Sequence, residues 1–330
     1  MKIFLFSVFL CLTVLSCGGQ SDEDLREKAD AAAQFFAGTF SLFIPDGYTV
    51  RAENVRDKGD GFTGGVFVVK SPDGYEANIP AVPFLLTPDG RRIVLEAHGP
   101  FDEDDLNDSQ VPGFKVAPQS FTGAPLLLVS SDGRVIAGNR ILDTAVDYAA
   151  ENMKKISLDE TAVLGDPGAP VVIVEFSDFQ CSYCRNSSGV LKKILDEYNG
   201  YVKVVYKQFP LDFHNWAYEA AEASYCFMRL GGNEAFGFFH DEVFAAQGEI
   251  TKDNHKGLFA ALAVKAGLNA GKFAQCVEQS ETADLVERDV AEAFSLQVDG
   301  TPAFFVDGLR VPNDPGLLRK AIEMRLSRIK

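Results

Sequence analysis

The chain has 330 residues, enough for two domains, and its 46% hydrophobic and 11% aromatic content is sufficient to build buried cores. Its formal charge of −16 argues against a nucleic-acid-binding protein, because such proteins need a basic surface to neutralise phosphates. The acidity otherwise predicts solubility and identifies no substrate.

An export signal is predicted at the N-terminus, over residues 1–16. Lys2 precedes an almost unbroken apolar run from Ile3 to Leu15, and small residues follow. A membrane-spanning helix needs roughly 20 apolar residues, so a transmembrane segment is the second interpretation. The tetrapeptide Val14-Leu15-Ser16-Cys17 resembles a bacterial lipobox, which makes Cys17 the expected lipidated first residue of the mature chain. Ordinary signal cleavage nearby, with Cys17 lost, is the alternative.

The cysteine count is consistent with export. Of the six cysteines, Cys11 lies in the signal and Cys17 is the lipid site, which leaves an even number. In an oxidising compartment an even remainder indicates two pairs, and adjacency identifies one of them as a CxxC. The four remaining residues are Cys181, Cys184, Cys226 and Cys276.

Residues 17–158 are predicted to form a small α+β domain, a candidate for dimerisation or partner binding. The acidic residues Asp22 to Asp24 would begin a solvated tether, and apolar spacing predicts an amphipathic helix within Glu27 to Phe43. Turn signals of the Asp-Gly type then predict hairpins. The expected strand pairs are residues 81–86 with 92–95 and residues 126–129 with 134–137. A helix over Ile141 to Lys155 would link this domain to the next, with a boundary loop at residues 165–168.

Residues 159–330 are predicted to form an α/β domain. The apolar run from Val171 to Phe176 is typical of a strand buried on both faces. An amphipathic helix follows the CxxC until Asn199-Gly200, and a second strand runs from Tyr201 to Phe209. Strand, helix and strand together predict a βαβ unit with a right-handed crossover.

The rest of this domain is predicted to be a helical insertion followed by the end of the sheet. Helical spacing from Ala217 to Asp284 places the insertion at about residues 214–284. A helix from Glu281 to Leu296 and a hairpin through residues 302–311 come next. Asp314 then caps a terminal helix that begins at Pro315.

Cys181 and Cys184 lie in a Cys-Ser-Tyr-Cys motif at a predicted helix start. Unpaired amides there stabilise an anion, so we expect a lowered pKa and a thiolate at Cys181. Cys184, one turn further, would be the resolving thiol in exchange through a mixed disulfide. Half of a zinc site is the alternative, but a second CxxC is absent from the sequence and the four histidines are scattered. No metal or cofactor is expected.

The segment from Glu175 to Cys184, with the sequence EFSDFQCSYC, resembles the active-site segment of the DsbA-like branch of the thioredoxin superfamily. Two further blocks match in family order, namely residues 206–211 with His214 and residues 299–305. The similarity runs from about Val163 to the C-terminus, which is about half of the chain. It implies a thioredoxin-like catalytic domain with a helical insertion, in a thiol–disulfide oxidoreductase.

The resemblance also implies roles for individual residues. Pro302 is expected to be cis and to face the disulfide, while Thr301 offers its backbone to an extended substrate and Ser182 and Tyr183 contact it. An ordinary turn at Thr301-Pro302 is the alternative. Glu175 is expected to be a buried carboxylate that takes the proton from Cys184, the alternative being a partly hydrated acid at a strand end.

Some members of this family carry a second disulfide in the insertion. The resemblance therefore implies that Cys226 pairs with Cys276 and closes a loop of about 50 residues. Two buried free thiols are the alternative. His214 is expected to be a surface group without a part in the site.

The predicted signal and the lipobox-like sequence ending at Cys17 predict a membrane-anchored lipoprotein of the periplasm or cell envelope. Its substrates would be exported proteins with cysteines, and a membrane redox partner would reoxidise or re-reduce the CxxC. Tyrosine before the second cysteine and an N-terminal domain before a linking helix are similar to the DsbC and DsbG isomerases. These features favour an isomerase or reductase and allow a homodimer. The alternatives are a monomeric oxidase of the DsbA kind and a lipoprotein that binds copper through both thiolates.

Overall fold

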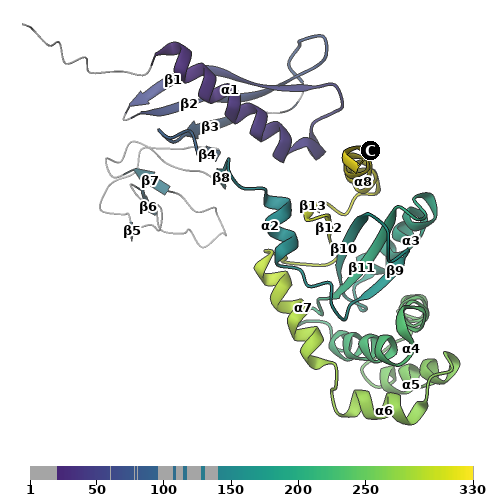
Figure 1. Ribbon diagram of the computed structural model, residues 1–330. Coiled ribbons are helices and arrows are strands. Elements are labelled where there is room, and N and C mark those ends of the chain that lie inside the picture. Colours follow the sequence, from purple (N-terminus) through teal and green to yellow (C-terminus); the bar gives the residue numbers. More distant parts are fainter. Residues whose placement is uncertain are drawn as a thin grey trace, which may run out of the picture. The chain divides into compact units, whose positions relative to one another are not determined.

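The computed structural model describes residues 21–59, 61–77, 79, 81–95, 107–108, 114–116, 128–130 and 140–329. It divides the chain into two compact units, Met1–Val146 and Asp147–Lys330, and each is described by itself (Figure 1). The predicted signal and Cys17 lie outside the described residues, as does most of the predicted hairpin of residues 126–137. Within the described ranges, every helix is too short or too polar to cross a membrane.

The first unit packs helix α1 (Asp22–Thr39) against an antiparallel sheet, as Figure 1 shows. The sheet order is β1 (Thr49–Gly59), β2 (Phe62–Lys70), β3 (Val82–Leu86), β4 (Arg92–Leu95) and β8 (Arg140–Asp143). Phe36 of α1 contacts Phe67 of β2 with ring centroids 4.8 Å apart, and Phe67 stacks on Phe84 of β3 at 4.1 Å. These aromatic contacts fix the helix on the sheet.

Smaller elements complete the first unit. A 3₁₀ turn, Ser41–Phe43, follows α1. Three short strands, β5 (Asn107–Asp108), β6 (Phe114–Val116) and β7 (Leu128–Ser130), pair in a separate antiparallel sheet. The hairpin predicted for residues 81–95 is confirmed, because β3 and β4 pair antiparallel and Gly90 adopts a φ of 69° in the turn.

Two predictions for this region are wrong. Asp22 to Asp24 are the first turn of α1 instead of a tether: the Ser21 hydroxyl accepts a hydrogen bond from the Asp24 amide at 3.1 Å, and acidic side chains are favourable at a helix N-terminus. The helix predicted from Ile141 is shorter, because residues 140–143 form β8 and pair with β4. Helix α2 covers only Tyr148–Lys154, after the Asp147 cap.

The second unit contains a mixed sheet. Its strand order is β13 (Leu309–Val311), β12 (Ala303–Val306), β10 (Val171–Ser177), β11 (Val202–Gln208) and β9 (Ala162–Gly165). Strands β10 and β11 are parallel and are joined by α3 (Ser182–Glu197), which confirms the βαβ unit. The other pairings are antiparallel. The segment predicted as a boundary loop includes Gly165, which ends β9 and lies within this unit.

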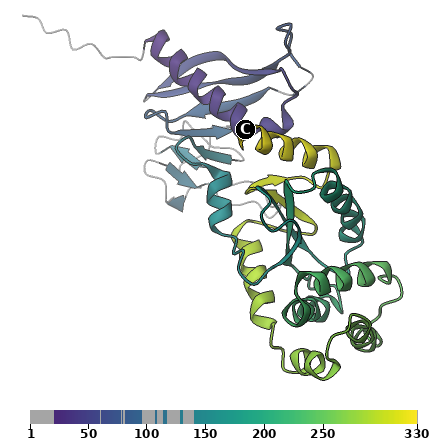
Figure 2. The same cartoon turned by 45° about the vertical axis from the view of Figure 1, so that its right-hand side comes forward.

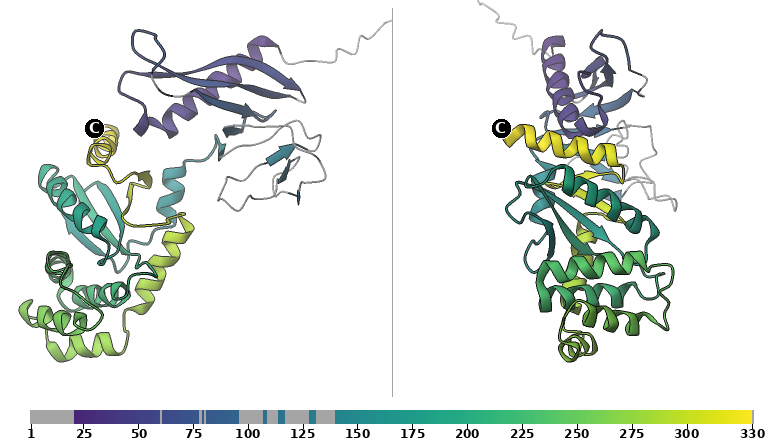
Figure 3. Two further views of the ribbon diagram at one scale, coloured as in Figure 1. Left: turned by 180° about the vertical axis from the view of Figure 1, so that it is seen from behind. Right: turned by 90° about the vertical axis from the view of Figure 1, so that its right-hand side faces the viewer.

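Helices cover both faces of this sheet, as Figures 2 and 3 show. Helix α3 and helix α8 (Pro315–Ile329) lie on one face, where Arg319 binds Glu197 at 2.8 Å. Helix α2 and helix α7 (Ala283–Ser295) lie on the other, over a core that includes Phe176 and Phe305. Asn152 of α2 donates to the Gly308 carbonyl at 2.9 Å, so α2 belongs to this unit and not to the region before it.

A buried charge cluster connects β11 to α7. Lys207 Nζ lies 2.9 Å from Asp289 Oδ1 and 2.9 Å from Glu292 Oε2, and the side chains of Lys207 and Asp289 are fully buried. Asp289 also accepts a hydrogen bond from the Tyr225 hydroxyl and forms an ion pair with Arg288 at 3.1 Å. Each buried charge therefore has partners of opposite sign, as burial requires.

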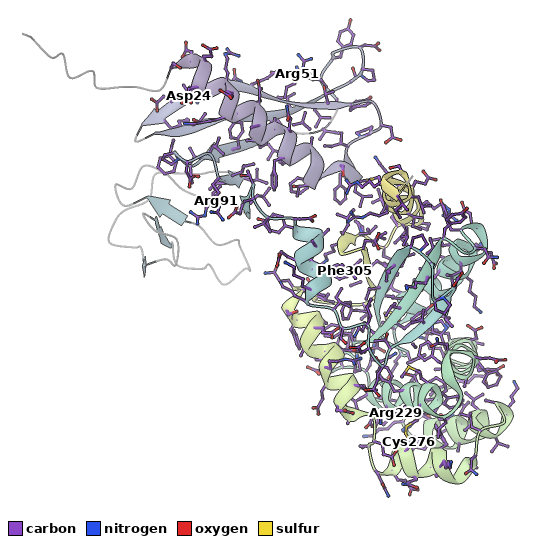
Figure 4. All side chains as sticks on the ribbon, viewed as in Figure 1. Asp24, Arg51, Arg91, Arg229, Cys276 and Phe305 are labelled. Atoms are coloured by element: carbon purple, nitrogen blue, oxygen red, sulfur yellow. A yellow bond between two sulfur atoms is a disulfide. The ribbon has the colours of Figure 1, made fainter. Side chains whose placement is uncertain are left out.

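The helical insertion lies between β11 and α7 and consists of α4 (Ala217–Ala245), α5 (His255–Lys265) and α6 (Ala270–Glu278). Helix α4 bends at Gly232, where φ is 70°. A disulfide joins Cys226 of α4 to Cys276 of α6, 50 residues apart, and Figure 4 labels Cys276 beside Arg229. Closing a loop of this length contributes about 4 kcal/mol in the chain-entropy account.

Candidate active site

Cys181 lies at the start of α3, just beyond the carboxyl end of β10. It is the N-terminal cap residue of the helix, with φ −74° and ψ 123°, and three residues connect it to the strand. Cys181 is 6% exposed, whereas Cys184, one turn further along α3, is fully buried. Both thiols are free, so the structure represents the dithiol form of the site.

The two thiols have opposite electrostatic environments. Hydrogen bonding from the Cys184 thiol, then from Thr301 and the amides of Cys184 and Tyr183, lowers the pKa of Cys181 to about 5 against the opposing effect of burial. Burial, followed by the nearby Cys181 and Glu175, raises the pKa of Cys184 well above its usual value. At neutral pH Cys181 is therefore a thiolate and Cys184 a thiol, which is the arrangement that disulfide exchange needs.

The Thr301–Pro302 segment faces the nucleophile from another part of the chain. The peptide bond between these residues is cis, and the Cys181 sulfur lies 3.5 Å from the Thr301 carbonyl oxygen. The block of residues 299–305 is thus brought to the CxxC although about 120 residues separate them along the chain.

Glu175 lies on β10 beneath α3 and is almost fully buried. Its Oε1 lies 2.9 Å from the Ser187 hydroxyl oxygen, which is also 2.8 Å from the Cys184 carbonyl, while Oε2 has no hydrogen-bond partner in the described chain. Burial raises the pKa of Glu175 to about 8, although the hydroxyls of Ser187 and Ser177 oppose this shift. The side chain therefore exchanges a proton near pH 8, next to the resolving cysteine.

Asp178 and His214, for which no role was predicted, lie beside the active-site turn. The buried Asp178 carboxylate accepts hydrogen bonds from the amides of Gln180 and Leu211, at 2.6 and 2.8 Å. It also lies 2.8 Å from His214 Nδ1. The Asp178 amide is 3.5 Å from the Cys184 sulfur. The expectation that His214 is an ordinary surface group is therefore wrong, because its ring is anchored to the residue beside the resolving thiol.

The helical insertion also contacts the active-site turn. The Gln180 side chain accepts a hydrogen bond from the Trp216 amide at 3.0 Å. The Gln247 side-chain amide donates to the carbonyls of Phe179 and Cys181, at 2.8 and 2.9 Å. Spacing along the chain gave no signal for these contacts, since their partners are separated by 36 to 68 residues.

Side chains that could meet a partner lie at the start of α3 and in the loop after β11. Tyr183 is 66% exposed, Ser182 is also exposed, and Phe213 beside His214 is 78% exposed. Within the described ranges, no cluster of three or more His, Cys, Asp or Glu side chains is arranged to hold a metal ion. The chemistry that these residues support directly is exchange at sulfur.

Comparison with known proteins gives matches that each cover about half of the chain. A family model described as "Thioredoxin" matches residues 157–324, slightly more than half of the chain. The "Probable disulfide bond formation protein D" of Bacillus anthracis is 29% identical over 200 residues, which cover 59% of this chain and 91% of that protein. The "Na(+)/H(+) antiporter NhaA 1" of Salinispora arenicola is 32% identical over 159 residues, or 48% of this chain. The chain spans only 23% of that antiporter's length.

Two solved structures are each similar to about half of the chain. The oxidised BdbD of Bacillus subtilis has 24% identity and a TM-score of 0.48, covering 52% of this chain and 95% of that one. The thiol–disulfide exchange protein alpha-DsbA2 of Wolbachia pipientis has 19% identity and a TM-score of 0.47, covering 54% and 93%.

Proposed function

Since the chain belongs to the thioredoxin family, among its DsbA-like thiol–disulfide oxidoreductases, we propose that it exchanges disulfides with the cysteines of exported proteins. The observation that carries this proposal is the pairing of a stabilised thiolate at Cys181 with a buried thiol at Cys184, one helical turn away. Cys181 is the nucleophile and Cys184 the resolving residue.

The first step joins the enzyme to its partner. The Cys181 thiolate attacks one sulfur of a partner disulfide, a bond forms between the two sulfurs, and the other partner sulfur leaves as a thiolate. The Thr301 backbone beside Cys181 supports recognition of an extended substrate chain through main-chain hydrogen bonds. Ser182 and the exposed Tyr183 extend this contact surface.

The second step releases the partner. Cys184 loses its proton to Glu175, and its thiolate attacks the Cys181 sulfur, which forms the Cys181–Cys184 disulfide and frees the second partner thiolate. The enzyme dithiol thereby loses two electrons, and the partner disulfide gains the same two. The reverse sequence donates the disulfide to a reduced partner.

The stabilised Cys181 thiolate bears on the direction of exchange. Stabilising the dithiol form makes the disulfide form a stronger oxidant. This supports disulfide donation or isomerisation over net reduction. An isomerase or a DsbA-type oxidase is therefore favoured over a reductase. Similarity to a probable disulfide bond formation protein supports the same choice.

The lipobox-like sequence at Cys17 supports a lipoprotein of the periplasm or cell envelope. A membrane redox partner would then reset the CxxC after each cycle. The unit of residues 21–146 is available for dimerisation or partner binding, as its position before the catalytic unit suggests. These assignments rest on the sequence and on the family.

The proposed function is tested by three assays on one preparation. We expect catalysed refolding of scrambled ribonuclease and little acceleration of insulin reduction. We also expect the Cys181–Cys184 reduction potential to lie well above that of thioredoxin, which is roughly −270 mV. Strong insulin reduction with a potential at or below that value would instead identify a reductase. Inactivity in all the assays, with Cys181 intact, would contradict exchange altogether.

Replacing Glu175 with glutamine is expected to slow the second step while it stabilises the fold. Above about pH 8 the wild-type carboxylate accepts the Cys184 proton, so the release rate of a mixed disulfide should rise through that pH. Glutamine accepts no proton, and release at pH 8.5 should be roughly 100-fold slower. Stopped-flow measurement of release from a preformed mixed disulfide gives this rate.

The same substitution should raise the free energy of unfolding, although it slows release of the partner. Between about pH 4.5 and 8 the folded protein retains the Glu175 proton that the unfolded chain has lost, so wild-type stability falls as the pH rises through this range. The E175Q variant lacks this loss and should be more stable at pH 8 by on the order of a few kcal/mol. An unchanged release rate would contradict the proton-transfer role, whatever happens to stability.

A further inference from the structure

Gln247 follows α4 in the helical insertion, and its side chain reaches the turn that precedes Cys181. Its Nε2 donates to the Phe179 carbonyl at 2.8 Å and to the Cys181 carbonyl at 2.9 Å. One amide group has two hydrogens to donate, and both are used here. The side chain is buried, so water does not readily replace these bonds.

The two carbonyls flank Gln180 and define the path of the chain into α3. The Cys181 carbonyl also accepts from the Arg185 amide at 3.2 Å, which is the first hydrogen bond of the helix. The Gln180 side chain points elsewhere and accepts from the Trp216 amide. Gln247 therefore binds the turn through its backbone carbonyls, and the Trp216 amide before α4 binds it through the Gln180 side chain.

We propose that Gln247 is a positioning residue for the nucleophile, and that the helical insertion acts through it on the reactivity of Cys181. This inference rests on the proposed function. The thiolate at Cys181 is stabilised by donors on Cys184, Thr301 and Tyr183, which act only while Cys181 stays at the cap position of α3. By fixing the Cys181 carbonyl, the Gln247 amide maintains that position.

Other ionisable groups near Cys181 are present in every Gln247 variant. Cys184 lies on the same helix, Glu175 lies on β10 beneath it, and the Asp178–His214 pair adjoins the turn. Their contributions to the titration of Cys181 therefore cancel when variants are compared.

The test measures the thiolate directly and needs no partner protein. The reduced full-length protein is alkylated with iodoacetamide between pH 3.5 and 8. The Cys181 thiolate displaces iodide as the sulfur–carbon bond forms, and mass spectrometry locates the adduct. In Gln247→Met, which keeps the length but cannot donate, we expect the midpoint at Cys181 to rise by about one pH unit. Alkylation at pH 4 then slows about tenfold, with little change at pH 8.

Two further variants distinguish positioning from general damage. Gln247→Glu places a carboxylate against two carbonyl oxygens and should raise the midpoint beyond that of Gln247→Met. Gln275→Met changes an exposed glutamine of α6, whose side chain bonds Gln279 and Glu281, and should leave the midpoint at the wild-type value. Urea unfolding of each variant reports whether the fold is retained.

The outcomes separate this inference from the proposed function. A wild-type midpoint near 8.5, the value of an ordinary cysteine, would contradict the proposed function itself. A low wild-type midpoint that Gln247→Met and Gln247→Glu leave unchanged would overturn the role of Gln247 alone. A midpoint that rises in the order wild type, Gln247→Met and Gln247→Glu, with Gln275→Met at the wild-type value, would support it.

Discussion

Replacing Cys184 with alanine is expected to stop turnover and to leave Cys181 joined to its partner proteins. The first exchange step needs only the Cys181 thiolate, whereas the release step needs the sulfur of Cys184. Because Cys184 is fully buried, no external thiol occupies its place beside Cys181. Refolding of scrambled ribonuclease should fall to the uncatalysed rate, and non-reducing gels of membrane extracts should show new bands that disappear on reduction.

The same experiment identifies the partners. The trapped bands, analysed by mass spectrometry, should contain exported proteins joined through Cys181. The matched control is the double variant C181S/C184A, which lacks the attacking sulfur and should trap nothing. Release as fast as in the wild type from C184A, or bands that persist in the double variant, would contradict the assignment of the two cysteines.

Replacing Lys207 with methionine is expected to cause the largest loss of stability, about 3 to 5 kcal/mol. The Lys207 ammonium lies between the Asp289 and Glu292 carboxylates, at 2.9 Å from each, in a place with no solvent contact. Removing it leaves Asp289 buried with Arg288 as its remaining cation. The lost attraction is not recovered from water, because water does not reach this position. Urea unfolding followed by circular dichroism measures the loss.

The control for this variant lies on the same strand. Lys203 of β11 extends to the surface, where its Nζ donates to the Pro167 carbonyl at 2.6 Å. Lys203→Met removes the same charge from the same strand, and we expect a loss of about 1 kcal/mol or less. Similar losses for the two variants would show that the buried cluster contributes no more than an exposed lysine.

The sequence predicted the parts of the catalytic unit whose cause is local. The apolar run that becomes β10, the one-sided helix after the CxxC and the turn at Asn199-Gly200 each have a signal within a few residues. Glu175 was identified from the family's active-site segment, and its burial follows from its place on the central strand. The cis bond before Pro302 and the Cys226–Cys276 disulfide, both implied by the resemblance, are present in the structure.

Several other features were not predicted, most of them because they depend on distant contacts. Residues 141–143 were assigned to a helix, yet they pair with β4 some 50 residues earlier. The charge run at Asp22 to Asp24 suggested a tether because its cap, Ser21, was not considered. His214 lies within hydrogen-bond distance of Asp178, and Gln247 donates to the carbonyls of Phe179 and Cys181. No sequence pattern indicates such pairs.

The disulfide between Cys226 and Cys276 makes a covalent ring of the chain between α4 and α6. Gln247 lies within this ring. A protease that cuts the exposed loop at residues 251–254 would therefore leave two fragments joined by the disulfide. The packing of the fold would also hold them in place. Loss of the insertion then requires two events, a cut in the chain and reduction of the disulfide.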